Sequence, residues 1–186
     1  MRKNFVKHVI ACVGAIASLH LGYSTARADF PAPRQQTAAF EVEFMSGMVD
    51  HHTMAIEMAE LCVGRATHEP LVELCREIIE SQREEVNSMR AWLKRWYRVS
   101  HEPTVDPADM SMLAELAALS GPEFEVAFMQ MMIEHHRKAI IDATACVDGA
   151  YHDELDSVCH NIIGTQKKEI RLMGRWLRKW YGVESR

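Results

Sequence analysis

Residues that interrupt regular secondary structure are scarce in this sequence, which has 9 Gly and 6 Pro among 186 residues and only 8% aromatic residues. No segment shows the alternation of apolar and polar residues that is typical of a half-buried β-strand. After the first 28 residues there is no apolar run of about 18 residues, the length that a membrane-spanning helix needs. These absences exclude a collagen-like or multispanning protein and favour an all-α globular fold.

The first 28 residues have the pattern of a secretory signal peptide. Arg2, Lys3 and Lys7 precede the apolar run Val9–Leu21, and Ala26-Arg27-Ala28 is a small-x-small cleavage site. Cleavage removes four basic residues and no acidic residue from totals of 21 and 26, so residues 29–186 carry a net charge of −9. We therefore expect a periplasmic protein that has no membrane contact after cleavage, and the negative charge disfavours nucleic acid as a partner.

The rest of the sequence consists of two copies of one unit. A shift of 84 residues aligns Phe40–Tyr97 with Phe124–Tyr181 without a gap, and 26 of the 58 aligned pairs are identical. Such self-similarity indicates an internal duplication. We predict one domain over residues 29–186, with repeat one at 38–97, a connection at 98–121 and repeat two at 122–181.

Each repeat has the pattern of two helices, because its apolar residues recur at steps of three and four. One helical hairpin leaves its apolar faces exposed, so the two hairpins are expected to pack as a four-helix bundle. We also predict a short helix over Met110–Leu119 in the connection and a disordered segment at Asp29–Gln36. The four long helices are predicted at Ala38–Val63, Pro70–Tyr97, Phe124–Val147 and Glu154–Tyr181.

Methionine and histidine occur together on the first helix of each repeat. Their offsets of three, four and seven residues place thioether and imidazole groups on shared helix faces. Thioether sulfur suits Cu(I), and imidazole suits copper and zinc, so this donor set indicates a soft-metal site. Methionine at helical spacing is also common core filler, and an inward histidine is often structural, so that alternative stays open. The candidate ligands are Met45, Met48, His51, His52, Met54 and Met58 in repeat one, and Met129, Met132, His135 and His136 in repeat two.

Polar residues interrupt the apolar seam of the second helix in each repeat: Gln82 and Glu85, and their equivalents Gln166 and Glu169. A carboxylate that faces a core needs a partner, since its unpaired burial costs several kcal/mol. The histidines of the first helix lie at about the same height in the hairpin. The two glutamates therefore accept a hydrogen bond from a ligating imidazole, bind the metal themselves, or belong to a His–Glu–Gln network without metal.

Four cysteines of residues 29–186 have the same spacing in the two repeats, with 12 residues between the members of each pair. We predict disulfide bonds Cys62–Cys75 and Cys146–Cys159 across the necks of the hairpins, each contributing about 3 kcal/mol to stability in the loop-entropy model. Export to an oxidising compartment favours the disulfide interpretation. The alternative is copper ligation by thiolates.

The repeated motifs resemble a known family. The pattern Phe-x-x-x-Met-x-x-His-His-x-x-Ala-Ile begins at Phe44 and again at Phe128, and Gln-x-x-Glu-x-x-x-Met-x-x-Trp-Leu begins at Gln82 and Gln166. Both are similar to the family called domain of unknown function 305, which is ferritin-like and includes periplasmic CopM-type proteins that bind copper or silver. The resemblance implies an exported protein that binds Cu(I), and silver as well, through Met and His. Lys138 and Asp142 replace Met54 and Met58 in repeat two, so we expect weaker binding there.

Three functions compete at this point. The first is a non-enzymatic copper-binding protein for copper homeostasis or tolerance, and the second is a structural or interaction bundle without metal. The third is a ferritin-like di-metal oxidase, which needs Glu-x-x-His motifs that are missing before both histidine pairs. For the first function, we expect affinity to fall below pH 6.5, because only neutral imidazole is a ligand. The sequence leaves open whether two chains pair as a homo-oligomer.

Overall fold

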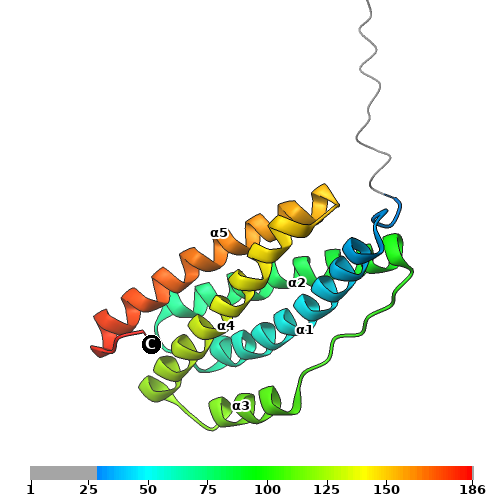
Figure 1. Ribbon diagram of the computed structural model, residues 1–186. Coiled ribbons are helices and arrows are strands. Elements are labelled where there is room, and N and C mark those ends of the chain that lie inside the picture. The colour runs from blue at the N-terminus through cyan, green and yellow to red at the C-terminus, as the bar shows by residue number, and fades with distance from the viewer. Residues whose placement is uncertain (1–28, 186) are drawn as a thin grey trace, which may run out of the picture.

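The structure is a computed structural model that describes residues 29–185. Four long helices form most of the described chain. They are α1 (Gln35–Arg65), α2 (Glu69–Tyr97), α4 (Gly121–Gly149) and α5 (Asp153–Trp176). The shorter α3 (Pro107–Ala117) lies in the connection, and a π-helix over Leu177–Tyr181 continues α5 (Figure 1). The described residues contain no β-strand, and the predicted all-α four-helix bundle is confirmed.

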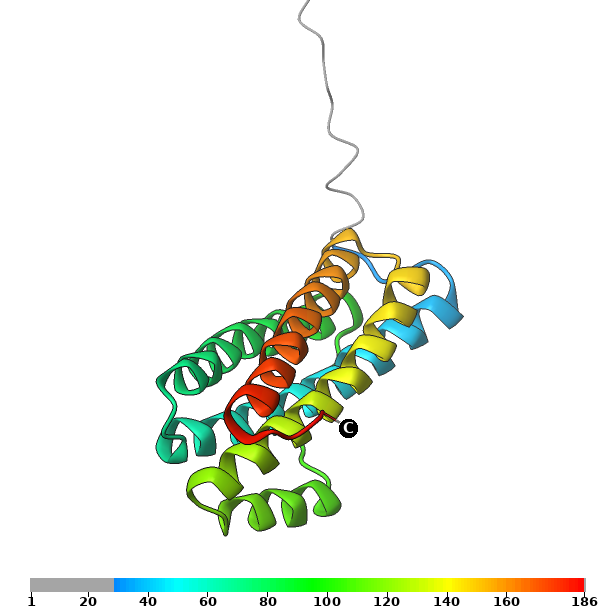
Figure 2. The ribbon, with the colours of Figure 1, turned by 90° about the vertical axis from the view of Figure 1, so that its left-hand side faces the viewer.

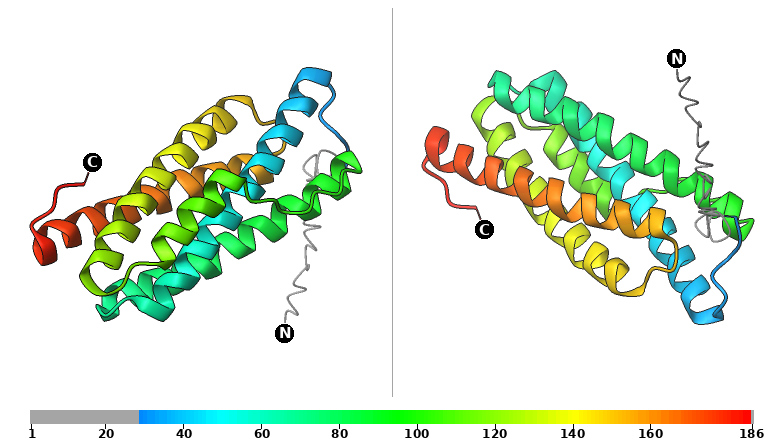
Figure 3. Two further views of the ribbon diagram at one scale, coloured as in Figure 1. Left: turned by 90° about the horizontal axis from the view of Figure 1, so that it is seen from below. Right: turned by 90° about the horizontal axis from the view of Figure 1, so that it is seen from above.

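The bundle is built from two hairpins, α1–α2 and α4–α5, which correspond to the two sequence repeats. The hairpins meet mainly through α1 and α4, whereas α2 and α5 have few contacts with each other. Views from other sides show that the four long helices extend along one common direction (Figures 2 and 3). Equivalent residues of the repeats therefore face each other across the contact between α1 and α4.

Each long helix begins one to three residues earlier than the sequence predicts. Proline in the first turn suits the start of α2, α3 and α4, because the missing N–H has no intrahelical partner there. At the start of α3, the Asp106 side chain also accepts a hydrogen bond from the backbone N–H of Ala108 at 2.8 Å. The last turn of α5 is π-helical, which no periodicity in the sequence predicts.

The segment before α1 packs against one end of the bundle, so the disorder predicted for Asp29–Gln36 is wrong. Ala32 is buried, and its N–H donates a hydrogen bond to the Tyr97 hydroxyl at 3.3 Å. The Asp29 carboxylate accepts a hydrogen bond from Arg95 Nε at 2.7 Å. These partners come from distant parts of the chain, which explains why local composition did not predict the order. The predicted signal peptide lies outside the described residues.

The apolar core is divided into two clusters along the bundle. One combines the second half of α1, including Met54 and Met58, with the start of α4, including Met129 and Met132. The other combines the first half of α1, including Met45, with the second half of α4. The histidine pairs of both helices lie between these clusters. A polar layer therefore crosses the middle of an otherwise apolar bundle. It is here called the histidine layer and consists of His51, His52, Gln82 and Glu85 with their equivalents His135, His136, Gln166 and Glu169.

Candidate metal site in the histidine layer

The first histidine of each pair meets its counterpart from the other repeat. His51 comes from α1 and His135 from α4, and their ring centroids lie 3.6 Å apart at an interplanar angle of 35°. The sequence led us to expect donors gathered separately in each repeat. The antiparallel contact of α1 with α4 instead brings two equivalent imidazoles together between the repeats.

Three of the four ring nitrogens of this histidine pair are buried without hydrogen-bond partners. Neither Nδ1 nor Nε2 of His51 has a partner, and Nδ1 of His135 also lacks one. Burial, reinforced by His52 and His136, lowers the pKa of His51 to about 3. Burial and the neighbouring His51 hold the pKa of His135 well below its usual range. Both rings are therefore neutral at ordinary pH and keep lone pairs that a metal ion could use.

The second histidine of each pair lies against a glutamate of the same repeat. His52 Nε2 and Glu85 Oε2 are 2.7 Å apart and hydrogen-bonded. His136 Nε2 and Glu169 Oε2 are also 2.7 Å apart, but not in hydrogen-bonding geometry. The structure thus brings together the histidines and glutamates that we expected at the same height in each hairpin. A carboxylate in this position fixes the orientation of an imidazole.

Further polar atoms of the histidine layer are buried without a partner. They include the Nδ1 atoms of His52 and His136 and the Oε1 atoms of Gln82 and Gln166. An unsatisfied buried polar group costs about 1–3 kcal/mol. A purely structural network would be expected to pair these atoms with one another. The arrangement instead leaves donor atoms available at the centre of the bundle.

The predicted methionine ligands are all buried but differ in their relation to the histidines. Met58 lines a cleft of about 370 Å³ together with His51 and His135. This cleft, here called the α3 cleft, opens beside the connection helix. Of the other predicted ligands, Met54, Met129 and Met132 lie in one apolar cluster, and Met45 and Met48 lie in the other.

Carboxylate and cysteine side chains do not form a separate site with histidine among the described residues. Within residues 29–185, no group of three or more His, Cys, Asp and Glu side chains has an arrangement that could hold a metal ion. The donors that converge on the histidine pair are imidazole nitrogens with a neighbouring thioether. Such a set fits a soft or borderline ion better than a hard one.

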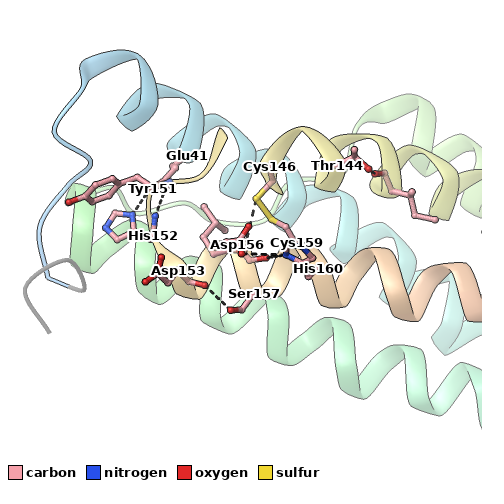
Figure 4. The surroundings of a disulfide bond; sticks show 12 residues. Glu41, Thr144, Cys146, Tyr151, His152, Asp153, Asp156, Ser157, Cys159 and His160 are labelled. Carbon is pink, nitrogen blue, oxygen red and sulfur yellow. Dashed lines mark hydrogen bonds and ion pairs between the residues drawn. A yellow bond between two sulfur atoms is a disulfide. The ribbon is translucent and has the colours of Figure 1, made fainter. Parts of the chain in front are cut away.

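The cysteines form the predicted pairs at the necks of the hairpins. Cys62 and Cys75 have a Cα separation of 6.2 Å, and Cys146 and Cys159 have one of 6.1 Å. Both pairs are disulfide-bonded, which leaves no thiolate among these four residues for copper ligation. Figure 4 shows the second disulfide between α4 and α5.

Sequence analysis missed two hydrogen-bonded clusters, here called the terminal clasps, in which a buried glutamate of one repeat holds the other repeat. Glu41 accepts hydrogen bonds from His152 Nδ1 at 2.6 Å and from the backbone N–H of His152 at 3.0 Å (Figure 4). It also accepts one from the Tyr97 hydroxyl at 2.5 Å. Glu125 accepts the equivalent hydrogen bonds from His68 and Tyr181. Their signal in the sequence was the identity of all these residues between the repeats.

Comparison with known proteins places these features in a family. The family model described as domain of unknown function (DUF305) matches residues 41–177. The Cu(I)-bound form of CopM is 31% identical over 76% of this chain and 98% of that chain, with a TM-score of 0.68. A DUF305 protein of Streptomyces coelicolor, described as a candidate secreted protein, is 26% identical over 79% of this chain and 95% of that chain, with a TM-score of 0.69.

A viral relative is similar over a shorter stretch. The uncharacterised protein L153 of Acanthamoeba polyphaga mimivirus is 36% identical over 62 residues, which are 33% of this chain and 41% of the viral protein. This chain therefore matches less than half the length of that relative.

Proposed function

We propose that this chain, which belongs to the DUF305 family, is an exported, non-enzymatic protein that binds Cu(I) or Ag(I) at His51 and His135. Its role in this proposal is copper homeostasis or tolerance. The single observation that carries the proposal is the pair of adjacent imidazoles, one from each repeat, with buried and unpartnered nitrogens.

The chemistry of the donors supports a soft monovalent ion. Two neutral imidazoles and the thioether of Met58 converge on one cleft. Cu(I) and Ag(I) accept such ligands, whereas Mg²⁺ and Ca²⁺ require oxygen ligands. Glu85 and Glu169 hold the neighbouring imidazoles and keep the layer in register. We therefore expect Cu(I) and Ag(I) to bind more tightly than Zn²⁺ or Fe²⁺.

The metal-bound structures of a similar protein support the binding of Cu(I) or Ag(I). CopM has been solved in Cu(I)-bound, Cu(II)-bound and Ag-bound forms, at 30–31% identity to this chain. Export is supported by the N-terminal pattern of residues 1–28 and by the candidate secreted relative from Streptomyces coelicolor. Among the described residues, none of the helices has an apolar stretch long enough to cross a bilayer.

A competition titration of purified protein against a coloured Cu(I) chelator tests the proposal. Replacement of both His51 and His135 by alanine should weaken Cu(I) binding by at least about 100-fold, since each lost ligand costs more than about 1.4 kcal/mol. His160→Ala is the matched control, because His160 is an exposed histidine on α5. Unchanged Cu(I) affinity in the folded double variant would show that His51 and His135 are not the copper ligands and would favour a structural role for them.

A further inference from the structure

The α3 cleft has a wall of three thioethers, two of which the predicted ligand set does not include. Met112 on α3 and Met131 on α4 line it together with Met58 on α1. Met112 and Met131 are partly exposed at the edge of the core, whereas Met58 is buried. Three elements thus place one thioether each around the opening that leads to His51 and His135.

The internal duplication provides a built-in comparison for this wall. The residue equivalent to Met58 in repeat two is Asp142, and the residue equivalent to Met131 in repeat one is Gly47. Both line a groove of about 330 Å³ between α1 and α4. The described chain has one connection helix, so Met112 has no counterpart. Met48 is the one methionine that lines this groove, against three methionines in the α3 cleft.

Core packing alone does not explain this distribution. Two hairpins that share a core need apolar side chains on both sides of the histidine pair, but three methionines line the α3 cleft and one lines the groove on the other side. The wall also has charged neighbours, with the carboxylates of Asp109 and Glu134 and the ammonium group of Lys138 lining the same cleft. Glu134 is ion-paired with Arg137 at 3.2 Å, so the positive and negative charges at this opening balance, and the thioethers are the groups that distinguish it.

We propose that Met58, Met112 and Met131 form a loading site that captures Cu(I) or Ag(I) at the mouth of the α3 cleft and passes the ion to His51 and His135. The inference rests on the proposed function, because it needs the histidine pair as the final site. The ion moves as a monovalent cation and no electron is transferred. Thioethers suit this step because they bind Cu(I) well and carry no proton that must leave first.

Uptake kinetics test the loading site separately from the final site. Met112→Leu combined with Met131→Leu nearly conserves side-chain volume and leaves the buried Met58 in place. We expect transfer of Cu(I) from a coloured chelator to become at least tenfold slower, while Cu(I) affinity at equilibrium changes less than threefold. The control is Met110→Leu, because Met110 is exposed on the same helix and lines a different groove; its transfer rate should equal that of the wild type.

NMR of protein with ¹³C-methyl-labelled methionine gives a second readout during titration with silver nitrate in chloride-free buffer. The methyl signals of Met112 and Met131 should shift, and that of Met110 should not. If the histidines respond to Ag(I) while both methyl signals and the transfer rate of the double variant stay unchanged, the loading site is wrong and the proposed function stands. If neither histidine nor methionine signals respond, both proposals fail.

Discussion

His152 at one end of the bundle and His51 in its middle both carry buried ring nitrogens, yet only His152 has hydrogen-bond partners. Nδ1 of His152 bonds to Glu41 at 2.6 Å, and its Nε2 donates to the carbonyl oxygen of Phe30 at 2.9 Å. Trp96 also stacks on its ring with a centroid distance of 3.7 Å. Both nitrogens of His51 lack a partner.

This difference separates a structural histidine from a functional candidate. In the terminal clasps, every carboxylate oxygen of Glu41 and Glu125 accepts hydrogen bonds from the opposite repeat. Such saturated networks stabilise the association of the two hairpins. In the histidine layer, buried imidazole nitrogens lack hydrogen-bond partners. A protein tolerates this cost when a bound ligand supplies the missing interaction. The two sets should therefore respond in opposite ways to mutation and to metal.

The largest expected effect is the loss of stability when one clasp is broken. Glu125→Ala leaves three partly buried donors on His68 and Tyr181 without an acceptor, so we expect the free energy of unfolding to fall by about 3 kcal/mol. Chemical denaturation measures this change. Glu123→Ala, an exposed change in the first turn of the same helix, should alter stability by less than about 0.5 kcal/mol. A similar small loss for both variants would remove the structural role of the clasp.

The clasp should also determine how the free energy of unfolding falls at acid pH. Burial tends to raise the pKa of Glu125, but hydrogen bonds from Tyr181, Thr67 and His68 outweigh it and lower the pKa from 4.5 to about 2. The unfolded chain therefore binds more protons in this window, and stability that is full above pH 4.5 is lost as pH falls towards 2, by about 3 kcal/mol. Unfolding experiments from pH 6 to 2 should show this loss in the wild type and a flatter profile in Glu125→Gln. An equally steep profile in that variant would assign the loss of stability at acid pH to other groups.

The histidine layer should behave differently from the clasp in stability measurements. Replacement of both His51 and His135 by leucine removes unpartnered polar groups from the core. The free energy of unfolding without metal should rise or change by less than about 1 kcal/mol, because three of the four ring nitrogens are buried without a hydrogen bond. Thermal denaturation of metal-free protein provides the comparison. A loss above about 2 kcal/mol would mean that the two imidazoles belong to a structural network.

The smallest expected effect is the response of metal affinity to mild acid. With an ordinary pKa of about 6.5, the neutral fraction of each ligating imidazole would fall about 50-fold between pH 6.5 and 4.5. Burial lowers the pKa of His51 to about 3 and that of His135 well below its usual value, so their neutral forms persist. Ag(I) affinity should therefore change less than about threefold over this range in competition titrations. A steep decline below pH 6.5 would restore the expectation drawn from the sequence.

The fold could be predicted from the sequence to within a few residues, because the steps of three and four and the 84-residue repeat report directly on helices and their pairing. The disulfide pairs followed from the same repeat. The meeting of His51 with His135 could not be predicted, since it depends on how α1 crosses α4 and not on the spacing within either helix. The lowered pKa values and the ordered segment at Asp29–Gln36 depend on burial by distant residues, which local patterns do not report.

The central claim is that the His51–His135 pair binds the metal and the hydrogen-bonded histidines of the terminal clasps do not. NMR spectra of the ¹⁵N-labelled imidazoles, recorded before and after addition of one equivalent of Ag(I), test it most directly. We expect the nitrogen signals of His51 and His135 to shift, while those of His68 and His152 in the terminal clasps stay in place. Shifts confined to the clasp histidines, or no imidazole shift while Ag(I) is bound, would contradict the claim.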